Sequence, residues 1–289
     1  MFEEQLLTKE KLAALLESDA KKDLHIHTFY SDGAFSPAEI IDMWSEGGFE
    51  LISITDHDGI DGYLAGREHA AETGMTLIPG IEFDSADPLG TDMHILGYGY
   101  DHTSPALIKA LDYILRERTE RNELMRTELS KLGYEITMQD LYEINEGRFI
   151  GKPTFGFVMM KKGYVHSMQE AFSTVFREPQ IQKICKVTLT SEAVVDLIHE
   201  AGGLAVLAHP MEQRRPGETY VQFFERLFVI LDTMRAYGID GIECYHPSAD
   251  DVQAETLRQY ASAHGLIVTR GSDFHAFHTR RDYSRYHRP

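Results

Sequence analysis

Apolar and polar residues alternate with period two near the start of the chain, which predicts a β-strand at residues 23–27. This segment reads Asp-Leu-His-Ile-His, so His25 and His27 both lie on its polar side. A leading helix is expected before it, at about residues 9–18. The first predicted strand therefore presents two imidazoles in the same direction.

A capped helix is predicted after this strand. Ser36 can cap a helix, Pro37 fits the first helical position, and Glu39 can bond back to the cap. The alternation then continues, with strands expected at 51–55, 76–82, 93–98, 204–208, 241–245 and 266–269, and with helices ending at Gly74 or covering 191–201, about 220–237, and a stretch capped by Ser248 with Asp251 at the box position. About seven strands alternating with helices favour parallel β/α units.

Residues 104–188 interrupt this alternation and contain no convincing core strand. A long helix is expected from Ser104-Pro105 to about Lys131, and Thr137, Pro153 and Ser167 are typical starts of shorter helices. Neither flanking half has enough strands to close a barrel alone. The prediction is one α/β barrel formed by residues 20–103 and 189–289, with a helical insertion at 104–188 and the leading helix in 1–19.

Composition narrows the class of protein. The 289 residues include 28 Lys and Arg against 46 Asp and Glu, a net charge of −18. Because this is the wrong sign for tracking a nucleic-acid backbone, no stable DNA binding is expected, whereas bound divalent cations would still attract a small anionic substrate. No apolar run reaches the roughly 18 residues of a membrane span, no export signal is seen, and the two cysteines form no disulfide framework. We expect a cytoplasmic protein without membrane association.

Histidines and acids gather at the predicted strand ends. In chain order they are His25 and His27, His57, Glu82, His94, His209, Asp273 and His275. Functional residues of α/β barrels gather at the C-terminal ends of strands, and imidazole and carboxylate suit zinc, manganese and iron(II). A lone histidine is more often a hydrogen-bonded core or surface residue. This many at successive strand ends instead predict a metal site.

Seven short motifs resemble those of the PHP (polymerase and histidinol phosphatase) phosphoesterases. They are Asp23–Thr28, Ser31–Gly33, Thr55–Asp58, Gly80–Glu82, His94–Tyr98, Ala208–Pro210 and Gly271–His275. Their spacing and the insertion are most similar to the bacterial subgroup that includes nucleoside 3',5'-bisphosphate phosphatase and a related 5'-to-3' exoribonuclease. The resemblance implies a distorted (β/α)7 barrel that binds two or three divalent ions, manganese, iron or zinc.

The resemblance also implies how the ligands divide. By motif, the first site takes His25, His27, Glu82 and Asp273, the second takes Glu82, His94 and His209, and the third takes Asp32, His57 and His275. Such ions lower the pKa of a water, clamp phosphate oxygens and stabilise the leaving group, so no side-chain nucleophile is needed. Glu82, Asp32, His57 and His275 are then expected to be catalytic through the water that the ions hold.

Four residues are candidates for substrate binding. His246 follows the sixth predicted strand, where it would meet substrate or protonate a leaving group, or would simply be a turn residue. Arg118 and Arg121 share a helix face, and Lys152 lies at a predicted helix start; a solvated face is the competing interpretation. In the subgroup the segment that here reads Gly-Lys-Pro-Thr usually reads Gly-Arg-Pro-His and holds a second phosphate, so recognition of that phosphate is expected to differ.

We therefore predict a metal-dependent phosphoesterase that acts on a small phosphorylated molecule, a nucleotide of the 3',5'-bisphosphate type. The alternatives among enzymes are a histidinol-phosphate-type phosphatase and an exonuclease that trims the 5' ends of short RNA. A metal-loaded binding or regulatory protein is the alternative outside enzymes. The chain has no G-x-S-x-G and no P-loop, which argues against serine hydrolases and nucleoside triphosphatases.

Overall fold

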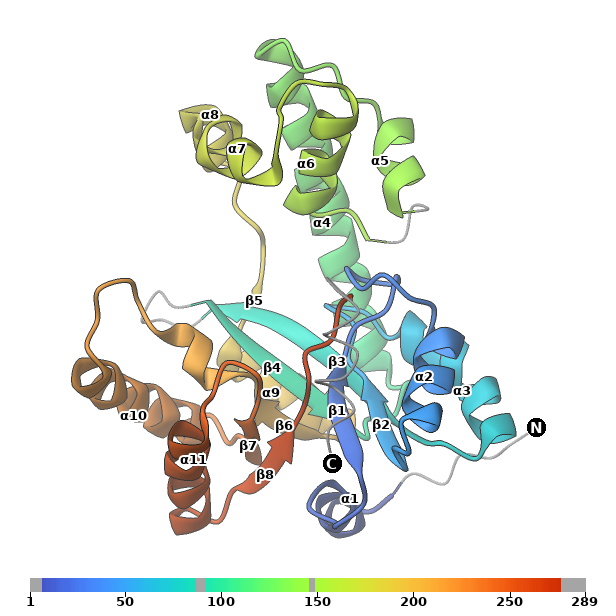
Figure 1. Ribbon diagram of the computed structural model, residues 1–289, viewed down its shortest axis with the longest axis vertical. Coiled ribbons are helices and arrows are strands. Elements are labelled where there is room, and N and C mark those ends of the chain that lie inside the picture. Colours follow the sequence, from blue (N-terminus) through green and yellow to red (C-terminus); the bar gives the residue numbers. More distant parts are fainter. Residues whose placement is uncertain (1–6, 87–91, 146–148, 277–289) are drawn as a thin grey trace. The chain divides into compact units, whose positions relative to one another are not determined.

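The computed structural model describes residues 7–86, 92–145 and 149–276. Two compact units divide the chain, one formed by residues 1–108 and 189–289 and the other by 109–188 (Figure 1). The strands are β1 (Lys22–Ile26), β2 (Leu51–Ile54), β3 (Thr76–Ala86), β4 (Asp92–Tyr98), β5 (Leu189–Thr190), β6 (Leu204–Leu207), β7 (Gly241–Tyr245) and β8 (Ile267–Arg270), all in the first unit.

One mixed sheet forms a nearly closed barrel in the first unit, and this confirms the predicted fold class. Its order is β1-β2-β3-β4-β6-β7-β8, with the short β5 paired to β3. The barrel closes between β1 and the segment after β8, where Ile26 and Phe274 form a parallel bridge and the His27 amide donates to the Phe274 carbonyl at 2.9 Å. The C-terminal ends of the parallel strands therefore meet at one rim.

The prediction of parallel units throughout was wrong for β4, which runs antiparallel to both β3 and β6. Only residues 87–91 separate β3 from β4, and a parallel crossover needs a dozen or more. Glu82 was also expected at the end of its strand, yet β3 continues to Ala86. The register of the antiparallel pair places Asp84 directly opposite His94.

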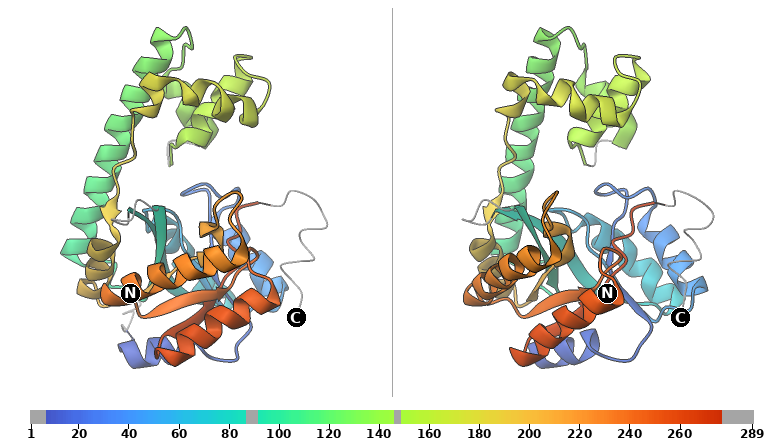
Figure 2. Two further views of the ribbon diagram at one scale, coloured as in Figure 1. Left: turned by 90° about the vertical axis from the view of Figure 1, so that its left-hand side faces the viewer. Right: turned by 60° about the vertical axis from the view of Figure 1, so that its left-hand side comes forward.

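Helices cover the outside of the barrel. They are α1 (Lys9–Leu16), α2 (Pro37–Glu46), α3 (Asp61–Thr73), α9 (Ser191–Glu200), α10 (Tyr220–Ala236) and α11 (Asp251–Ala263), with a 3-10 turn at Pro210–Gln213. Figures 1 and 2 show α2 and α3 on the outer side of β1 and β2, and α11 on the outer side of β7 and β8. Leu12 and Leu16 of α1 are buried against apolar side chains of β1, β2, β3, β4 and β6. This core fixes the strands whose ends carry the candidate ligands.

Two helix caps test the predictions made from the sequence. Ser36 and Glu39 form the expected capping box, in which the Ser36 hydroxyl accepts from the Glu39 amide at 3.2 Å. The cap predicted for α11 was wrong, since Asp250 caps this helix and Gln253 completes the box. Ser248 is instead engaged with the Nδ1 atom of His246, 2.7 Å from its hydroxyl.

The second unit is helical. Helix α4 (Pro105–Lys131) begins in the first unit and continues into the second, which also contains α5 (Met138–Asn145), α6 (Lys152–Lys161), α7 (Met168–Ser173), α8 (Pro179–Gln182) and a 3-10 turn at Val175–Arg177. This unit has a core of its own, in which Met125, Leu129, Phe155 and Met159 are fully buried. No helix among the described residues has the length and apolarity that a membrane crossing needs.

Candidate metal centre

Side chains from three parts of the barrel form the first candidate group: His25 and His27 from β1 and its end, Glu82 from β3, and Asp273 from the segment after β8. The Nε2 atoms of His25 and His27 lie 3.2 Å apart. Each of them lies 3.1–3.4 Å from Asp273 Oδ1 and from Glu82 Oε2. Ligand atoms around one zinc ion, each about 2.0–2.1 Å from it, lie roughly 3.0–3.4 Å from one another, so these four side chains fit a bound ion.

Glu82 gives an independent test of that fit. Its Oε2 atom is buried and makes no hydrogen bond in the described part of the chain, although imidazole nitrogens of His25, His27 and His57 lie within 3.4 Å of it. A buried carboxylate oxygen without a hydrogen bond is costly. A divalent cation at this position would remove that cost, because it bonds to carboxylate oxygen and imidazole nitrogen together.

The other oxygen of Glu82 belongs to the second candidate group, with His94 and His209. Glu82 Oε1 lies 2.9 Å from His94 Nδ1 and 3.0 Å from His209 Nε2, and the two nitrogens are 3.2 Å apart. Glu82 therefore lies between the first two groups, with one oxygen toward each.

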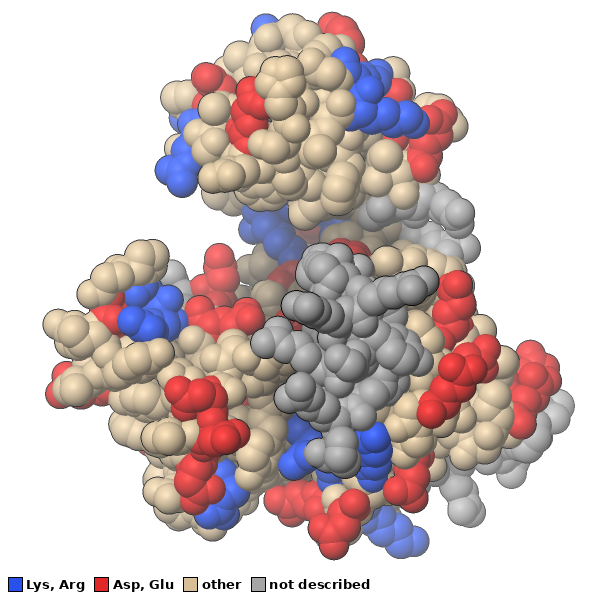
Figure 3. All heavy atoms as spheres, in the orientation of Figure 1, with Lys and Arg blue, Asp and Glu red and all other residues tan. Residues whose placement is uncertain are grey.

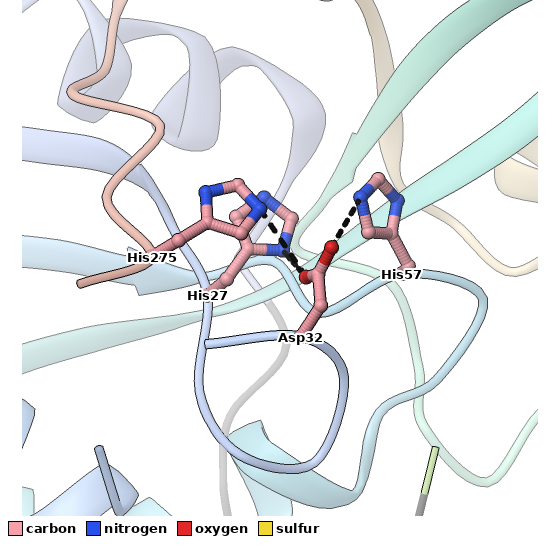
Figure 4. Close-up of side chains that lie close together, drawn as sticks. All are labelled: His27, Asp32, His57 and His275. Atoms are coloured by element: carbon pink, nitrogen blue, oxygen red, sulfur yellow. Dashed lines mark ion pairs between the residues drawn. The ribbon is translucent and has the colours of Figure 1, made fainter. Parts of the chain in front are cut away.

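The third candidate group surrounds Asp32 and is more open (Figure 4). One carboxylate oxygen of Asp32 faces His275 Nε2 at 3.2 Å and His27 Nδ1 at 3.6 Å, while the other faces His57 Nε2 at 3.8 Å. The geometry brings His27 into this group, to which the motifs did not assign it. All nine ligand candidates derived from the sequence thus lie in one connected cluster.

Backbone strain is concentrated at this rim. Among the described residues that are not glycine, positive φ angles occur at Asp58 (49°), His209 (25°) and Asp273 (51°). Such conformations cost about 1–3 kcal/mol and persist where the surrounding structure imposes them. Two of these three residues are candidate ligands, and the third follows His57, so the strain coincides with the metal centre.

Two buried carboxylates hold the rim in place. Asp56 accepts hydrogen bonds from the Thr28 amide and hydroxyl at 2.8 and 2.7 Å, and from the Ser31 hydroxyl at 2.5 Å. Asp23 accepts from the Trp44 indole at 2.8 Å and from the Ser272 amide at 2.9 Å. Asp56 therefore ties the loop that carries Asp32 to the end of β2, and Asp23 ties the segment before Asp273 to β1.

Glu243 on β7 belongs to the site but was missed from the sequence. It is fully buried, its Oε1 lies 3.1 Å from His25 Nδ1, and its Oε2 accepts from the His209 amide at 2.8 Å. Holding Nδ1 of His25 directs Nε2 toward the first group. The sequence gives little indication of this role, because a single acidic residue within an apolar strand is also found where the side chain has no function.

The pKa values show how strongly these charges are coupled. Burial lowers the pKa of His27, but the carboxylates of Asp273 and Glu82 beside its ring outweigh burial and raise it to about 10. Burial lowers the pKa of His57 to about 3 despite the nearby Glu82 carboxylate. Burial opposes ionisation of Glu82, yet the surrounding imidazoles hold its pKa well below the usual range. The carboxylates are thus ionised and require protons or cations beside them.

The four substrate-binding candidates lie in different units. His246 is buried at the end of β7, with Nε2 3.4 Å from Asp273 Oδ2. Arg118, Arg121 and Lys152 belong to the second unit. There the Arg118 guanidinium lies 4.2 Å from the centre of the Phe149 ring, three residues before Lys152.

Residues 23–241 match the family model described as the PHP domain. The chain belongs to the PHP family. Its relatives include a 3',5'-nucleoside bisphosphate phosphatase from Chromobacterium violaceum, 31% identical over 89% of this chain and 88% of the relative, and a 5'-3' exoribonuclease from Haemophilus influenzae, 27% identical over 88% and 90%. A structure from Bifidobacterium adolescentis, proposed to be a metal-dependent phosphoesterase, superimposes with a TM-score of 0.75 at 26% identity, covering 93% of this chain and 95% of that one.

Family membership agrees with the resemblance seen in the motifs and establishes a metal-dependent phosphoesterase, an enzyme of the hydrolase class. The PHP match includes every member of the first two groups except Asp273, which lies beyond residue 241. Candidate ligand clusters of His, Asp and Glu are present, as metal dependence requires.

Proposed function

We propose that this chain hydrolyses a phosphate ester of a small nucleotide of the 3',5'-bisphosphate type, and that it does so in the cytoplasm. The observation that carries the proposal is the connected cluster of His25, His27, Asp32, His57, Glu82, His94, His209, Asp273 and His275. When bound, two or three divalent ions (manganese, iron or zinc) would supply a nucleophilic water at neutral pH and neutralise charge on the phosphate.

The chain's own residues prepare this chemistry. Glu82 is 1% exposed and offers one oxygen to each of two groups, so it sets the separation of the ions that these groups would hold. Asp32, His57 and His275 form the more open group, which leaves room for a phosphate beside them. His246 lies next to Asp273 and is proposed to contact the substrate near the leaving oxygen.

Recognition of a second phosphate is proposed for the second unit. Lys152 is the first residue of α6, where the helix N-terminus and a positive side chain favour an anion. Arg118 lies over Phe149, and the side-chain amide of Asn122, which accepts from Arg121, donates to the Ile150 carbonyl at 3.0 Å, so both arginines lie near the segment before Lys152. These three cations are the proposed contacts to that phosphate.

Thr154 limits how closely this segment can match the subgroup. Its side chain is 3% exposed, and its hydroxyl accepts from the Gly151 amide at 3.2 Å. The hydroxyl is thus used to cap α6 and does not replace the imidazole that the subgroup usually has there. We propose that binding of the second phosphate rests on point charges without a bidentate contact.

The test is phosphate release by the manganese-loaded protein from a panel of substrates. The panel contains a nucleoside 3',5'-bisphosphate, the two mononucleotides, histidinol phosphate and a short 5'-phosphorylated RNA. We expect the highest kcat/KM with the bisphosphate. A higher value with histidinol phosphate or a mononucleotide, or faster shortening of the RNA, would overturn the substrate assignment in favour of that alternative.

Full metal occupancy without turnover of any substrate would support a binding or regulatory protein instead. The acidic surface is consistent with a small substrate. On the face drawn in Figure 3, Asp and Glu side chains are spread over the first unit, and no broad band of Lys and Arg crosses the residues drawn there in colour. A long nucleic acid would meet repulsion over such a face.

A further inference from the structure

Asp84 and His94 face each other across the antiparallel pair of β3 and β4. They are register partners, and side chains of directly opposite residues lie on the same face of a sheet. Glu82 is two residues before Asp84 on β3, so it points to that face as well. The sheet itself therefore brings a second carboxylate beside the second candidate group.

The two ring nitrogens of His94 face different carboxylates. Nδ1 lies 2.9 Å from Glu82 Oε1 and 3.2 Å from His209 Nε2. Nε2 lies on the other side of the ring, 2.8 Å from Asp84 Oδ1. A proton on Nε2, paired with the Asp84 carboxylate, leaves Nδ1 with the lone pair that a metal ion needs.

We propose that Asp84 is a positioning residue that holds His94 as a ligand of the second metal site and tightens binding of that ion. The proposal rests on the metal centre described under the proposed function. The carboxylate restrains the imidazole ring and raises its basicity, and both effects strengthen the bond from Nδ1 to a cation.

The first group contains the same arrangement with other residues. There Glu243 faces Nδ1 of His25 at 3.1 Å, and Nε2 of the same ring points to Glu82 and Asp273. In both cases an acidic strand residue outside the nine ligand candidates derived from the sequence faces the ring nitrogen of a ligand histidine that points away from the ion. The repetition supports a positioning role for Asp84.

A direct ligand role for Asp84 is the competing interpretation, since Asp84, His57 and His94 also form a group that could hold an ion. Asp84 Oδ1 lies closer to His94 Nε2, at 2.8 Å, than to His57 Nδ1, at 3.8 Å. Use of Nε2 for such an ion would also withdraw His94 from the second group.

The test is a metal titration of chelator-treated protein with Zn²⁺ against a competing chromophoric chelator. For Asp84→Asn we expect one ion per chain to bind about 10- to 100-fold more weakly while the remaining ions bind as in the wild type. Asp84→Glu should recover part of the loss. Asp92→Asn is the matched control, because Asp92 is an exposed acid two residues before His94 on β4, and it should leave every affinity unchanged.

A double-mutant cycle separates the two interpretations. If Asp84 acts through His94, Asp84→Asn should cause no further loss in a His94→Ala background. Additive losses would overturn the positioning role, as would unchanged affinities in Asp84→Asn alone. The titration contains no substrate, so its result does not depend on whether a bisphosphate is hydrolysed. Failure of the substrate panel would leave this inference standing.

Discussion

Glu82 is the residue on which most contacts of the centre converge. Its two oxygens face imidazole nitrogens of His25, His27, His57, His94 and His209 at 2.9–3.4 Å. A carboxylate between two ions would bind and neutralise both of them, whereas each histidine of the second group would bind only one. Loss of its charge should therefore have a larger effect than loss of a single imidazole.

The substitution Glu82→Gln tests this expectation. It keeps the shape of the side chain but removes one negative charge and one ligand oxygen, so we expect kcat to fall at least about a thousand-fold, roughly 4 kcal/mol of transition-state stabilisation. Metal content should fall as well, with the circular-dichroism spectrum unchanged. Glu72→Gln, at an exposed position of α3, is the matched control. Wild-type turnover and metal content in Glu82→Gln would show that Glu82 bridges nothing.

The pKa of His27 predicts how metal binding depends on pH. Because its value is raised to about 10, the metal-free chain carries a proton there at pH 8, and an ion must displace it. We expect net proton release at pH 8, measured by titration calorimetry with Zn²⁺ in two buffers of different ionisation enthalpy. Identical heats in the two buffers would contradict the shift.

The raised pKa of His27 also predicts how the free energy of unfolding of the metal-free chain changes with pH. The folded metal-free chain binds this proton more tightly than the unfolded chain, whose histidine titrates near 6.5. This contribution to stability is present below pH about 6.5 and is lost as the pH rises toward 10. Urea unfolding of chelator-treated protein at pH 7 and pH 9.5 would measure that loss.

At the scale of elements, hydrophobic alternation predicted seven of the eight strands that the structure describes, all but the two-residue β5, and cap residues predicted several helix starts. The alternation could not show whether a strand runs parallel or antiparallel to its neighbours. The chain around β4 has the period of any strand, and only the short connection at residues 87–91 indicates an antiparallel partner. Asp84 was missed for this reason, because its proximity to His94 follows from the antiparallel register.

The candidate ligands were predictable for a different reason. His25, His27 and His57 stand at strand ends, where a polar residue conflicts with the apolar core and so attracts attention. Glu243 lies inside a buried strand, and its partner His25 is more than 200 residues away in sequence. Its role therefore could not be seen from the residues around it. Distances across the barrel could not be derived from periodicity at all.

Helix α3 packs closely against the residues that hold the candidate metal centre in place, and a substitution in this helix can test that contact. At Gly62 an added Cβ would lie 1.9 Å from the Asp56 carboxylate and 2.8 Å from the Thr28 hydroxyl. Gly62→Ala should therefore break the hydrogen bonds that tie the loop of Asp32 to β2, and we expect a loss of about 1–3 kcal/mol in the free energy of unfolding. The nearest atom to a Cβ at Gly59 is 3.6 Å away, so Gly59→Ala is the control, compared by urea denaturation. Equal stabilities of the two variants would contradict this packing.

At the scale of the whole molecule, two units divide the proposed work, with the metal groups in one and the three cations in the other. Lys152→Ala should raise KM for a bisphosphate several-fold and leave a mononucleotide unaffected, because only the bisphosphate loses a charge-assisted contact away from the reacting phosphate. Lys161→Ala is the matched control, since Lys161 ends the same helix and pairs with Glu143 at 3.1 Å. Equal changes for both substrates would contradict a selective role.

The closure of the barrel has a consequence for amide hydrogen exchange. The bridge between Ile26 and Phe274 joins the two ends of the sheet, and the first ligand group spans it, with His25 and His27 on one side and Asp273 on the other. An ion held by this group would oppose separation of the two edges. Deuterium should then enter the His27 amide, which donates to the Phe274 carbonyl, much more slowly in the metal-loaded protein than after chelation, whereas amides in the core of the helical unit should exchange at the same rate in both.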